Sequence, residues 1–217
     1  MRNKFGTLFM FLGVALIWGA LALSLHNQQE ARNAGEQSDA LLQKLVEQID
    51  AQKQSDGIEW IGKTEEAETY LPMPQIPEEL LTAEDVKMTE VVIDGQSYIG
   101  YLSIPALNLE LPILSDWSYT LLKIAPCRYD GTVRGNDLVL FAHNFDRHFG
   151  RLKKLSEGDS VYFTDMDGNT TAYEVVAQDI LDPYAVEEMT AGVYDLTLFT
   201  CTYGGKSRVT IYCNRIP

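Results

Sequence analysis

The 217-residue sequence is poor in cysteine, histidine and basic residues. Three cysteines are an odd number, so they cannot all pair within one chain and at least one thiol stays free unless chains are crosslinked. Three histidines limit the choice of a general base to His26, His143 and His148. Only 17 Lys and Arg residues stand against 31 acidic ones, which argues against a nucleic-acid partner. No internal repeat is visible.

Charge is also absent from residues 5–25, which are predominantly apolar and follow Arg2 and Lys4. A run of this length can span a hydrocarbon core as a helix, and its positive flank is expected to stay in the cytoplasm. We therefore predict a single-pass anchor in the cell membrane, with residues 1–4 cytoplasmic and the rest extracytoplasmic. A cleaved signal peptide ending near residues 20–22 is the alternative, although the apolar run is longer than is usual for one.

Residues 26–87 are expected to connect this anchor to a folded domain. Apolar residues recur at helical spacing within residues 26–57 and predict one short amphipathic helix, which could be a stalk, a dimerisation seam or a helix packed on the domain. The following stretch is acidic and contains three prolines, which indicates an extended linker. Residues 56–77 could instead form a lid over an active groove, since parts of them are apolar.

Short strands follow one another in residues 88–217, the expected compact domain. An Asp94-Gly95 turn between two apolar runs predicts a first hairpin, and further strands are expected over residues 138–143, 160–164, 171–179, 194–201 and 207–214. Helical turns are expected near residues 117–123 and 149–155. Strands at this spacing with few helices predict a mainly β fold, a closed or nearly closed antiparallel barrel.

The most informative segment is a hairpin around Gly204 and Gly205. Two glycines between β-branched and aromatic runs favour a tight turn with positive φ. With these glycines as the loop, Cys201 lies opposite Arg208, their Cβ atoms about 5 Å apart. The same register places apolar pairs on the other face: Leu196 with Cys213, Leu198 with Ile211 and Thr200 with Val209. The hairpin therefore predicts a thiol beside a permanent cation on a solvent-facing or groove-facing surface.

These residue types suit nucleophilic catalysis. A cysteine with an ordinary pKa is only about 3% thiolate at pH 7, so it needs a neighbouring cation or base. Arg208 could stabilise the thiolate or bind the oxyanion, and His143, at the end of an apolar run, is the best-placed base. Cys213 is expected to be a small buried hydrophobe. Cys127 has no readable role, and a disulfide between Cys127 and Cys213 stays open.

Several segments resemble the sortases, the cysteine transpeptidases of Gram-positive cell surfaces. Residues 197–201 (TLFTC) resemble the TLxTC signature, Arg208 stands where the essential arginine follows, and residues 141–144 (FAHN) resemble the histidine segment. Residues 100–105, 149–152 and 158–161 match further family segments in the same order. The resemblance covers roughly residues 88–215. Ala142 stands where many members have glycine, and the Cys201 to Arg208 spacing leaves the class open.

The resemblance implies an eight-stranded sortase barrel that cleaves an LPxTG-like sorting signal in surface proteins or pilins. A thioester on Cys201 would be resolved by an amine of a cell-wall precursor or a pilin lysine. In that scheme His143 is general acid and base, Arg208 stabilises the oxyanion, and Thr200 and Asn144 are the candidates for substrate binding.

Some sortases use calcium, and residues 165–169 resemble the start of a calcium loop only faintly, without the distal glutamate. Asp167-Gly168 is better explained as a hairpin turn, and we assign no metal or cofactor. Two other kinds of protein remain open. One is a non-catalytic extracytoplasmic β-module, and the other is a cysteine peptidase that only hydrolyses its substrate.

Overall fold

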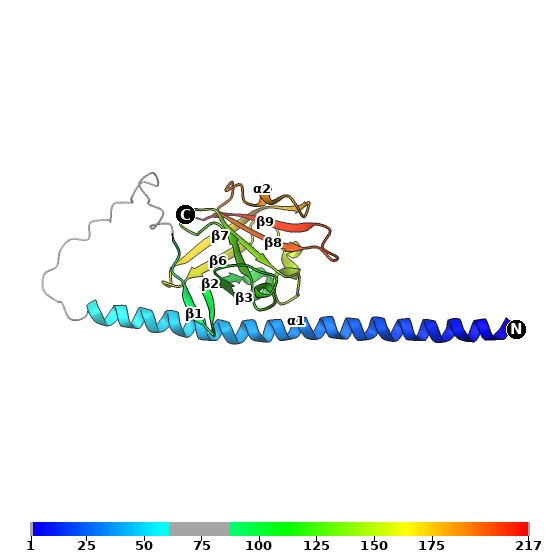
Figure 1. Cartoon of the computed structure of the whole chain (residues 1–217). Coiled ribbons are helices and arrows are strands. Elements are labelled where there is room, and N and C mark those ends of the chain that lie inside the picture. Colours follow the sequence, from blue (N-terminus) through cyan, green and yellow to red (C-terminus); the bar gives the residue numbers. More distant parts are fainter. Residues whose placement is uncertain (1, 61–86, 217) are drawn as a thin grey trace.

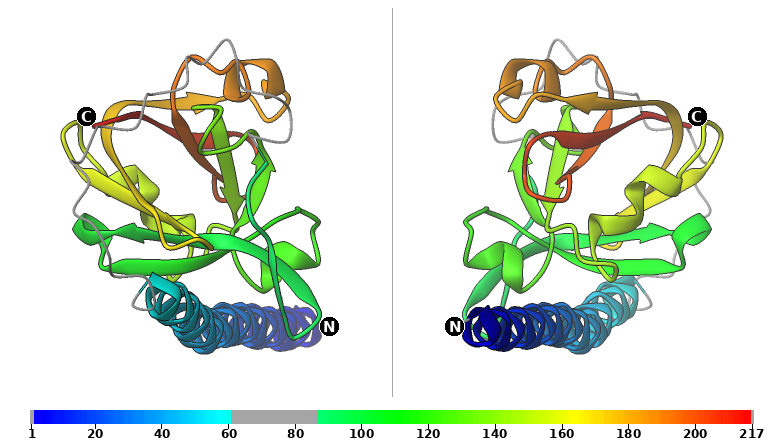
Figure 2. Two further views of the ribbon diagram at one scale, coloured as in Figure 1. Left: turned by 90° about the vertical axis from the view of Figure 1, so that its left-hand side faces the viewer. Right: turned by 90° about the vertical axis from the view of Figure 1, so that its right-hand side faces the viewer.

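The computed structural model describes the backbone of residues 2–60 and 87–216, and the side chains of residues 8–53 and 87–216. A single long helix, α1 (Arg2–Trp60), lies beside a β-barrel, which sits against the C-terminal half of the helix (Figure 1). Two views along the helix show the barrel resting on one side of it (Figure 2). The N-terminal half of α1 projects beyond the barrel.

The barrel is a closed ring of eight strands. Among the described residues the strands are β1 (Val91–Ile93), β2 (Gln96–Ile104), β3 (Leu109–Leu114), β4 (Cys127–Asp130), β5 (Leu138–Ala142), β6 (Ser160–Asp165), β7 (Thr170–Leu181), β8 (Leu196–Cys201) and β9 (Arg208–Arg215). Their order is β1-β2-β3-β4-β5-β8-β9-β7-β6, and a further pairing of β2 with β6 closes the ring. Strand β1 is an added edge on β2.

Short helices fill the connections: η2 (Pro105–Leu107), η3 (Leu121–Lys123), η4 (Phe149–Lys154) and α2 (Val186–Met189). The two expected helical turns are therefore present at η3 and η4. The expected strands and the Asp94-Gly95 turn are also confirmed, with Gly95 at φ 79°. At the predicted turn between β6 and β7, Gly168 has φ 79° and donates a backbone hydrogen bond to the Asp165 carbonyl (3.0 Å). Strands β3 and β4 were not predicted.

Two apolar clusters lie on opposite sides of the barrel wall. The inner cluster fills the barrel and includes Leu198, Ile211 and Cys213, all fully buried. The outer cluster includes Phe141, Phe199 and Cys127 and is covered in part by α1. Because side chains alternate across a strand, β5 and β8 contribute to both clusters. Cys127 and Cys213 belong to different clusters, and all three cysteines are free thiols, so a disulfide between these two is excluded.

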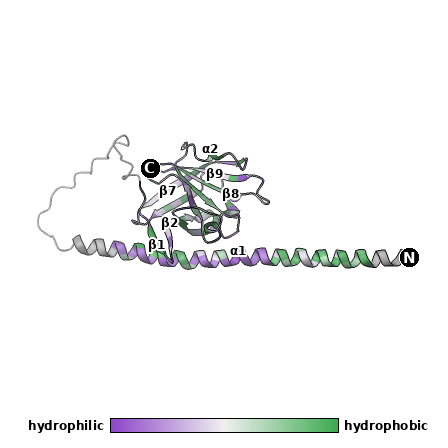
Figure 3. Cartoon of the chain, viewed as in Figure 1, coloured by the Kyte–Doolittle hydropathy of each residue, from purple (hydrophilic) through white to green (hydrophobic). Residues whose placement is uncertain are grey.

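Helix α1 corrects the expectation of a separate short amphipathic helix after the anchor. No proline interrupts residues 2–60, so the helix runs on from the apolar segment. Figure 3 shows the change from an apolar N-terminal half to a polar C-terminal half. The polar half packs on the barrel through Leu41, Leu45 and Ile49, which is one of the three arrangements expected for this segment.

The predicted lid and linker lie mostly outside the described residues. Residues 56–60 form the last turns of α1, and residues 61–77 are not described. Within the described residues, one helix is long and apolar enough to cross a membrane, and it is the N-terminal part of α1.

Candidate active site

Cys201 lies between the two strands that carry its expected partners. Strand β8 pairs in parallel with β5 and antiparallel with β9. Because β3 and β4 are also parallel, the expectation of an antiparallel barrel was wrong at these two pairs. Cys201 lies opposite Arg208 in the β8–β9 pair, as predicted. On the other side Ala142 pairs with Thr200, so His143 and Cys201 each follow the last register pair of two adjacent strands. Neighbouring strands lie about 4.8 Å apart, so the three residues share one edge of the barrel wall.

The hairpin register agrees with the sequence prediction at each pair that the prediction named. Leu196 pairs with Cys213, Leu198 with Ile211, and Thr200 with Val209. Gly204 and Gly205 both have positive φ, 80° and 72°, which other residues rarely adopt. The Thr202 and Ser207 backbones continue the pairing (N···O 2.9 Å). The tight turn thus places the thiol and the guanidinium at facing positions.

Arg208 is partly buried and is held by its own hairpin. Its Nη1 donates hydrogen bonds to the Gly205 and Ser207 carbonyls, each at 3.2 Å. A guanidinium has five N–H donors, and these two bonds use Nη1, so Nη2 and Nε retain three more. The side chain is therefore oriented and still has the donors needed to bind a developing oxyanion.

His143 begins a compact loop that joins β5 to η4. The His143 carbonyl accepts a hydrogen bond from the Phe149 amide (3.2 Å), and the His148 amide donates to the Phe145 carbonyl (2.9 Å). The imidazole lies against the Phe145 ring, with 5.0 Å between the centroids. These contacts hold the half-buried imidazole at the end of β5, beside the end of β8.

Burial lowers the pKa of His143 below its usual value of 6.5, and the Lys123 ammonium adds to this effect. Glu30 of α1 acts in the opposite direction. The net shift favours the neutral imidazole at pH 7, which is the form that can accept a proton from a thiol.

Thr200 is placed differently from the other candidates. It is buried on the inner side of β8, and its hydroxyl donates a 2.8 Å hydrogen bond to the Ala142 carbonyl. This bond ties the end of β8 to the end of β5, so the observed role of Thr200 is to align the strands that carry Cys201 and His143. A substrate contact for Thr200 stays a prediction.

Asn144 is half-buried in the loop after His143. The loop is tight here, because a Cβ added at Gly150 would lie 2.4 Å from the Asn144 carbonyl oxygen. Its expected contact with substrate also stays a prediction.

A hollow of about 530 Å³ lies on the outer face of the wall. Its lining includes Trp117, Arg128 and Tyr129. The Tyr129 ring packs edge-on against Phe199 (5.2 Å between centroids), and Phe199 shares its face of β8 with Cys201. The hollow therefore lies on the same side of the wall as the thiol. Sequence reasoning missed it because β4 was not predicted; the aromatic residues at 117, 119 and 129 were the available signal.

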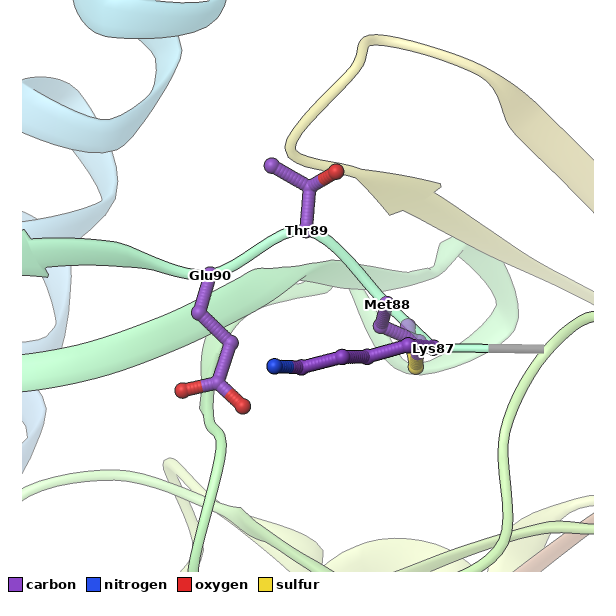
Figure 4. Close-up of a pocket in the computed structure, with 4 residues that line it drawn as sticks. All are labelled: Lys87, Met88, Thr89 and Glu90. Atoms are coloured by element: carbon purple, nitrogen blue, oxygen red, sulfur yellow. The ribbon is translucent and has the colours of Figure 1, made fainter. Parts of the chain in front are cut away.

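A second hollow, of about 460 Å³, is lined by Lys87, Met88, Thr89 and Glu90 (Figure 4). These consecutive residues include neither a thiol nor an imidazole, and none belongs to the predicted site. Within the part of the chain that the structure describes, no cluster of three or more His, Cys, Asp or Glu side chains could hold a metal ion.

His148 is fully buried, in contrast to the solvated position expected for it. Neither of its ring nitrogens has a well-formed hydrogen bond. Burial lowers its pKa to about 4, and nearby His143 adds to the shift. His26 lies in α1, immediately after the apolar run. His143 is therefore the histidine that the fold brings to Cys201.

Comparison with known proteins agrees with this arrangement. The model of the sortase domain matches residues 102–216. A curated relative, sortase A of Bacillus anthracis, is 33% identical over 116 residues, which are 50% of this chain and 54% of that protein. The chain thus spans about half the length of the curated relative that it matches.

Solved structures give the same family. Sortase C1 of Streptococcus suis is similar with a TM-score of 0.50 and 32% identity, over 55% of this chain and 73% of that chain. Sortase C1 of Streptococcus agalactiae has a TM-score of 0.51 and 25% identity, over 64% of this chain and 78% of that chain.

Proposed function

This chain belongs to the sortase family, and from that premise we propose that it is a membrane-anchored cysteine transpeptidase. It cleaves a sorting signal, LPxTG-like in sequence, near the C-terminus of a surface protein or pilin. The acyl group passes to Cys201 as a thioester and then to an amine. Residues 88–217 form the catalytic domain.

One observation carries this proposal. The strand order β5-β8-β9 places Cys201 between His143 and Arg208 at one edge of the barrel wall. A nucleophile, a base and a fixed cation within reach of one substrate carbonyl are the parts needed for acyl transfer. A non-catalytic β-module has no need of this combination.

In the first step the Cys201 sulfur attacks the scissile carbonyl, and neutral His143 takes the thiol proton. The oxygen of the tetrahedral intermediate carries the negative charge, which Arg208 stabilises through its remaining N–H donors. His143 then gives its proton to the leaving nitrogen as the C–N bond breaks. The products are a thioester on Cys201 and a free amine on the released fragment.

In the second step an acceptor amine attacks the thioester. His143 takes a proton from this amine, a new amide bond forms, and the Cys201 sulfur leaves and recovers its proton. Water can attack the same thioester, in which case the product is a free carboxylate. Whether water or an amine reaches the thioester first therefore decides between hydrolysis and transpeptidation.

The N-terminal part of α1 is proposed as the membrane anchor, through residues 5–25. The segment fits a membrane span by length and composition. Arg2 and Lys4 favour a cytoplasmic N-terminus and an extracytoplasmic barrel. A membrane-impermeant maleimide applied to intact cells is expected to label Cys201. Labelling only after lysis would contradict this orientation.

Thioester capture is the direct test of the activity. The purified full chain is incubated with a peptide that contains an LPxTG-like signal, and the acylated protein is detected by mass spectrometry. Cys201→Ala is expected to abolish both the adduct and peptide cleavage. Cys213→Ala is the matched control, because it removes a buried thiol from the next strand, far from the solvent. Cleavage that persists in Cys201→Ala would refute the mechanism.

Product analysis separates the transpeptidase from the peptidase that only hydrolyses. With an added amine such as triglycine, the amide product is expected to increase at the expense of the free acid. A product mixture that is unaffected by the amine would favour the peptidase. Unreactive Cys201 in an alkylation assay across neutral pH would favour a non-catalytic module.

The sortase class and the acceptor amine depend on the activity proposed above and need separate tests. The relatives above include a sortase A and two sortases C1. We propose that the acceptor is a cell-wall precursor amine or a pilin lysine. A panel of sorting peptides combined with both kinds of amine tests this directly. Deletion of residues 56–77 tests the predicted lid, since removal of a lid is expected to accelerate cleavage.

A further inference from the structure

Helix α1 connects the apolar segment to the barrel without a break. It is helical from Arg2 to Trp60, and the apolar run ends at Leu25. Beyond that run one face of the helix is buried on the barrel. The buried residues are Ala34, Gly35, Ser38, Leu41, Leu45 and Ile49. Positions three or four residues apart lie on one side of a helix, so one face of α1 packs on the barrel. The same helix carries the proposed anchor at its other end.

Ion pairs link the barrel to the helix at successive heights. Lys123 of η3 lies 3.8 Å from Glu30, Arg147 pairs with Asp39, and Asp94 pairs with Lys44 at 2.6 Å. Such exposed pairs contribute little energy, but they mark which part of the barrel lies at which level of the helix.

The rise of an α-helix converts these pairs into distances from the end of the apolar run. Glu30 lies about 8 Å beyond Leu25, whereas Lys44 lies about 29 Å beyond it. The polar layer on each side of a bilayer is about 5 to 8 Å thick. When residues 5–25 span the hydrocarbon core, the Lys123 end of the barrel therefore meets the headgroup layer. The Asp94 end stands well above it.

The Lys123 end of the barrel carries exposed aromatic residues. Trp117 and Tyr119 precede η3 and are 39% and 74% exposed. Their rings pack together, with 5.9 Å between centroids. The Leu122 and Lys123 amides donate to the carbonyls of Ser118 and Thr120, which keeps this segment compact.

The turn between β8 and β9 also lies toward the Lys123 end of the barrel. In Figure 1 it extends from the barrel toward the N-terminal half of α1. Tyr203 at this turn is 95% exposed, and Lys206 is also exposed. An isolated exposed tyrosine is unremarkable, but here two separate loops each place aromatic and lysine side chains toward the level where α1 becomes apolar.

We propose that these two loops, residues 117–123 and 203–206, rest on the surface of the same lipid bilayer that holds α1. The proposal rests on the membrane anchoring proposed above. Tryptophan and tyrosine favour the membrane interface because one end of each ring is apolar and the other polar. Lys123 and Lys206 supply ammonium groups for headgroup phosphates, despite the acidity of the chain as a whole.

This placement has a consequence for the active site. The turn follows Cys201 directly and precedes Arg208, and Lys123 and Glu30 are close enough to His143 to affect its pKa. The site therefore opens beside the headgroup layer.

Fluorescence quenching in bilayers tests the proposal, because the chain has one tryptophan in the proposed anchor, Trp18, and another in a proposed surface loop, Trp117. The full chain is placed in vesicles of phosphatidylcholine and phosphatidylglycerol. Trp18→Phe with Trp60→Phe leaves Trp117, and Trp60→Phe with Trp117→Phe leaves Trp18 in the anchor. Quenchers are attached either to the lipid headgroup or deep in the acyl chain.

Trp117 is expected to lose more of its emission to the headgroup quencher than to the deep one, because tryptophan favours the membrane interface. Trp18 is expected to show the opposite preference. With all three tryptophans replaced by Phe, Tyr203→Trp reports the second loop and is expected to behave as Trp117 does. Val92→Trp in the same background is the matched control, since Val92 is 68% exposed at the Asp94 end of the barrel. A tryptophan there is expected to respond to neither quencher.

The outcomes separate the two proposals. If Trp18 is quenched while Trp117 and Tyr203→Trp respond no more than Val92→Trp, the bilayer contact is refuted and the anchoring stands. If Trp18 is not quenched by the deep label, the anchoring fails and the bilayer contact fails with it.

Discussion

The two faces of strand β8 perform different tasks in this barrel. The inner face carries Leu196, Leu198 and Thr200 and is closed off from solvent by the inner cluster. The outer face carries Phe199 and Cys201 and borders an aromatic hollow. One strand thus supports the fold with one set of residues and presents the candidate nucleophile with the other. Stability and activity are expected to respond to different substitutions on the same strand pair.

The largest expected effect is on the outer face, at Arg208. Arg208→Ala removes the donors proposed for the oxyanion and is expected to lower kcat/KM about 100- to 1000-fold. Steady-state peptide cleavage measures this, and the thermal stability of the barrel is expected to change little because the side chain is half-exposed. Arg208→Lys keeps the charge without the fork of donors, and an activity equal to wild type would show that charge alone suffices.

The next effect is on the inner face. Leu198→Ala leaves a cavity in the inner cluster and is expected to cost about 2 to 5 kcal/mol in the free energy of unfolding. Urea denaturation of the full chain measures this loss. Below the unfolding transition, thiol alkylation of Cys201 should keep its wild-type rate. A much altered rate would mean that the two faces are not independent.

His148 makes stability depend on pH. Its pKa is about 4 in the folded protein, with burial as the main cause, against about 6.5 for an exposed histidine. Protonation therefore favours unfolding, so its contribution is fully present above pH 6.5 and is lost as the pH falls toward 4. The loss is of the order of 3 kcal/mol.

Denaturation midpoints at pH 7 and pH 5 measure this dependence. His148→Phe keeps a ring in the buried site and is expected to show a smaller drop than wild type over the same interval. An identical drop in both proteins would assign the pH dependence to other groups.

The smallest effect on stability is expected at Thr200, the inner-face residue of β8 that is hydrogen-bonded to the end of β5. Thr200→Val removes the hydrogen bond to Ala142 while keeping the shape, at a cost of about 1 kcal/mol. Because this bond aligns β5 with β8, we also expect kcat to fall more than the stability change explains. Thr200→Ser retains the hydroxyl and is expected to restore kcat. Unchanged kcat in Thr200→Val would leave Thr200 with a purely structural role.

The β8–β9 hairpin was predictable because its signals are local. Two glycines set the turn, and alternation then determines which residues face inward. The same alternation already placed Thr200 with Val209 on the apolar face. The observed burial of Thr200 therefore follows from the register, whereas its assignment to substrate binding came from the family resemblance.

Strands β3 and β4 were missed for physical reasons. Strand β3 contains Pro112, which ordinarily argues against a strand interior. It is tolerated here because β3 meets β4 at a single pair, Leu114 with Cys127, and is nearly an edge. Strand β4 has only four residues, too few for a clear pattern.

The continuity of α1 and its docking on the barrel were also beyond sequence reasoning. The buried face of α1 is small, and its partners on the barrel are far away in the chain. The first half of the helix is apolar and the second half polar, which suggested an anchor followed by a separate helix. In the candidate site, Cys201 and Arg208 were predicted as a cross-strand pair. His143 was predicted only as a separate residue, because its position depends on the parallel pairing of β5 with β8, which local sequence does not reveal.

That parallel pairing has a consequence for how the protein becomes active. Strands β6 and β7 lie between β5 and β8 in the chain, so the parallel β5–β8 pair is joined by a long connection that contains both of them. A partly folded barrel therefore holds the imidazole in one segment and the sulfur in another. The Cys201 thiol comes to lie beside the end of β5 only when β8 pairs with that strand, so the chemistry proposed for it depends on a closed barrel.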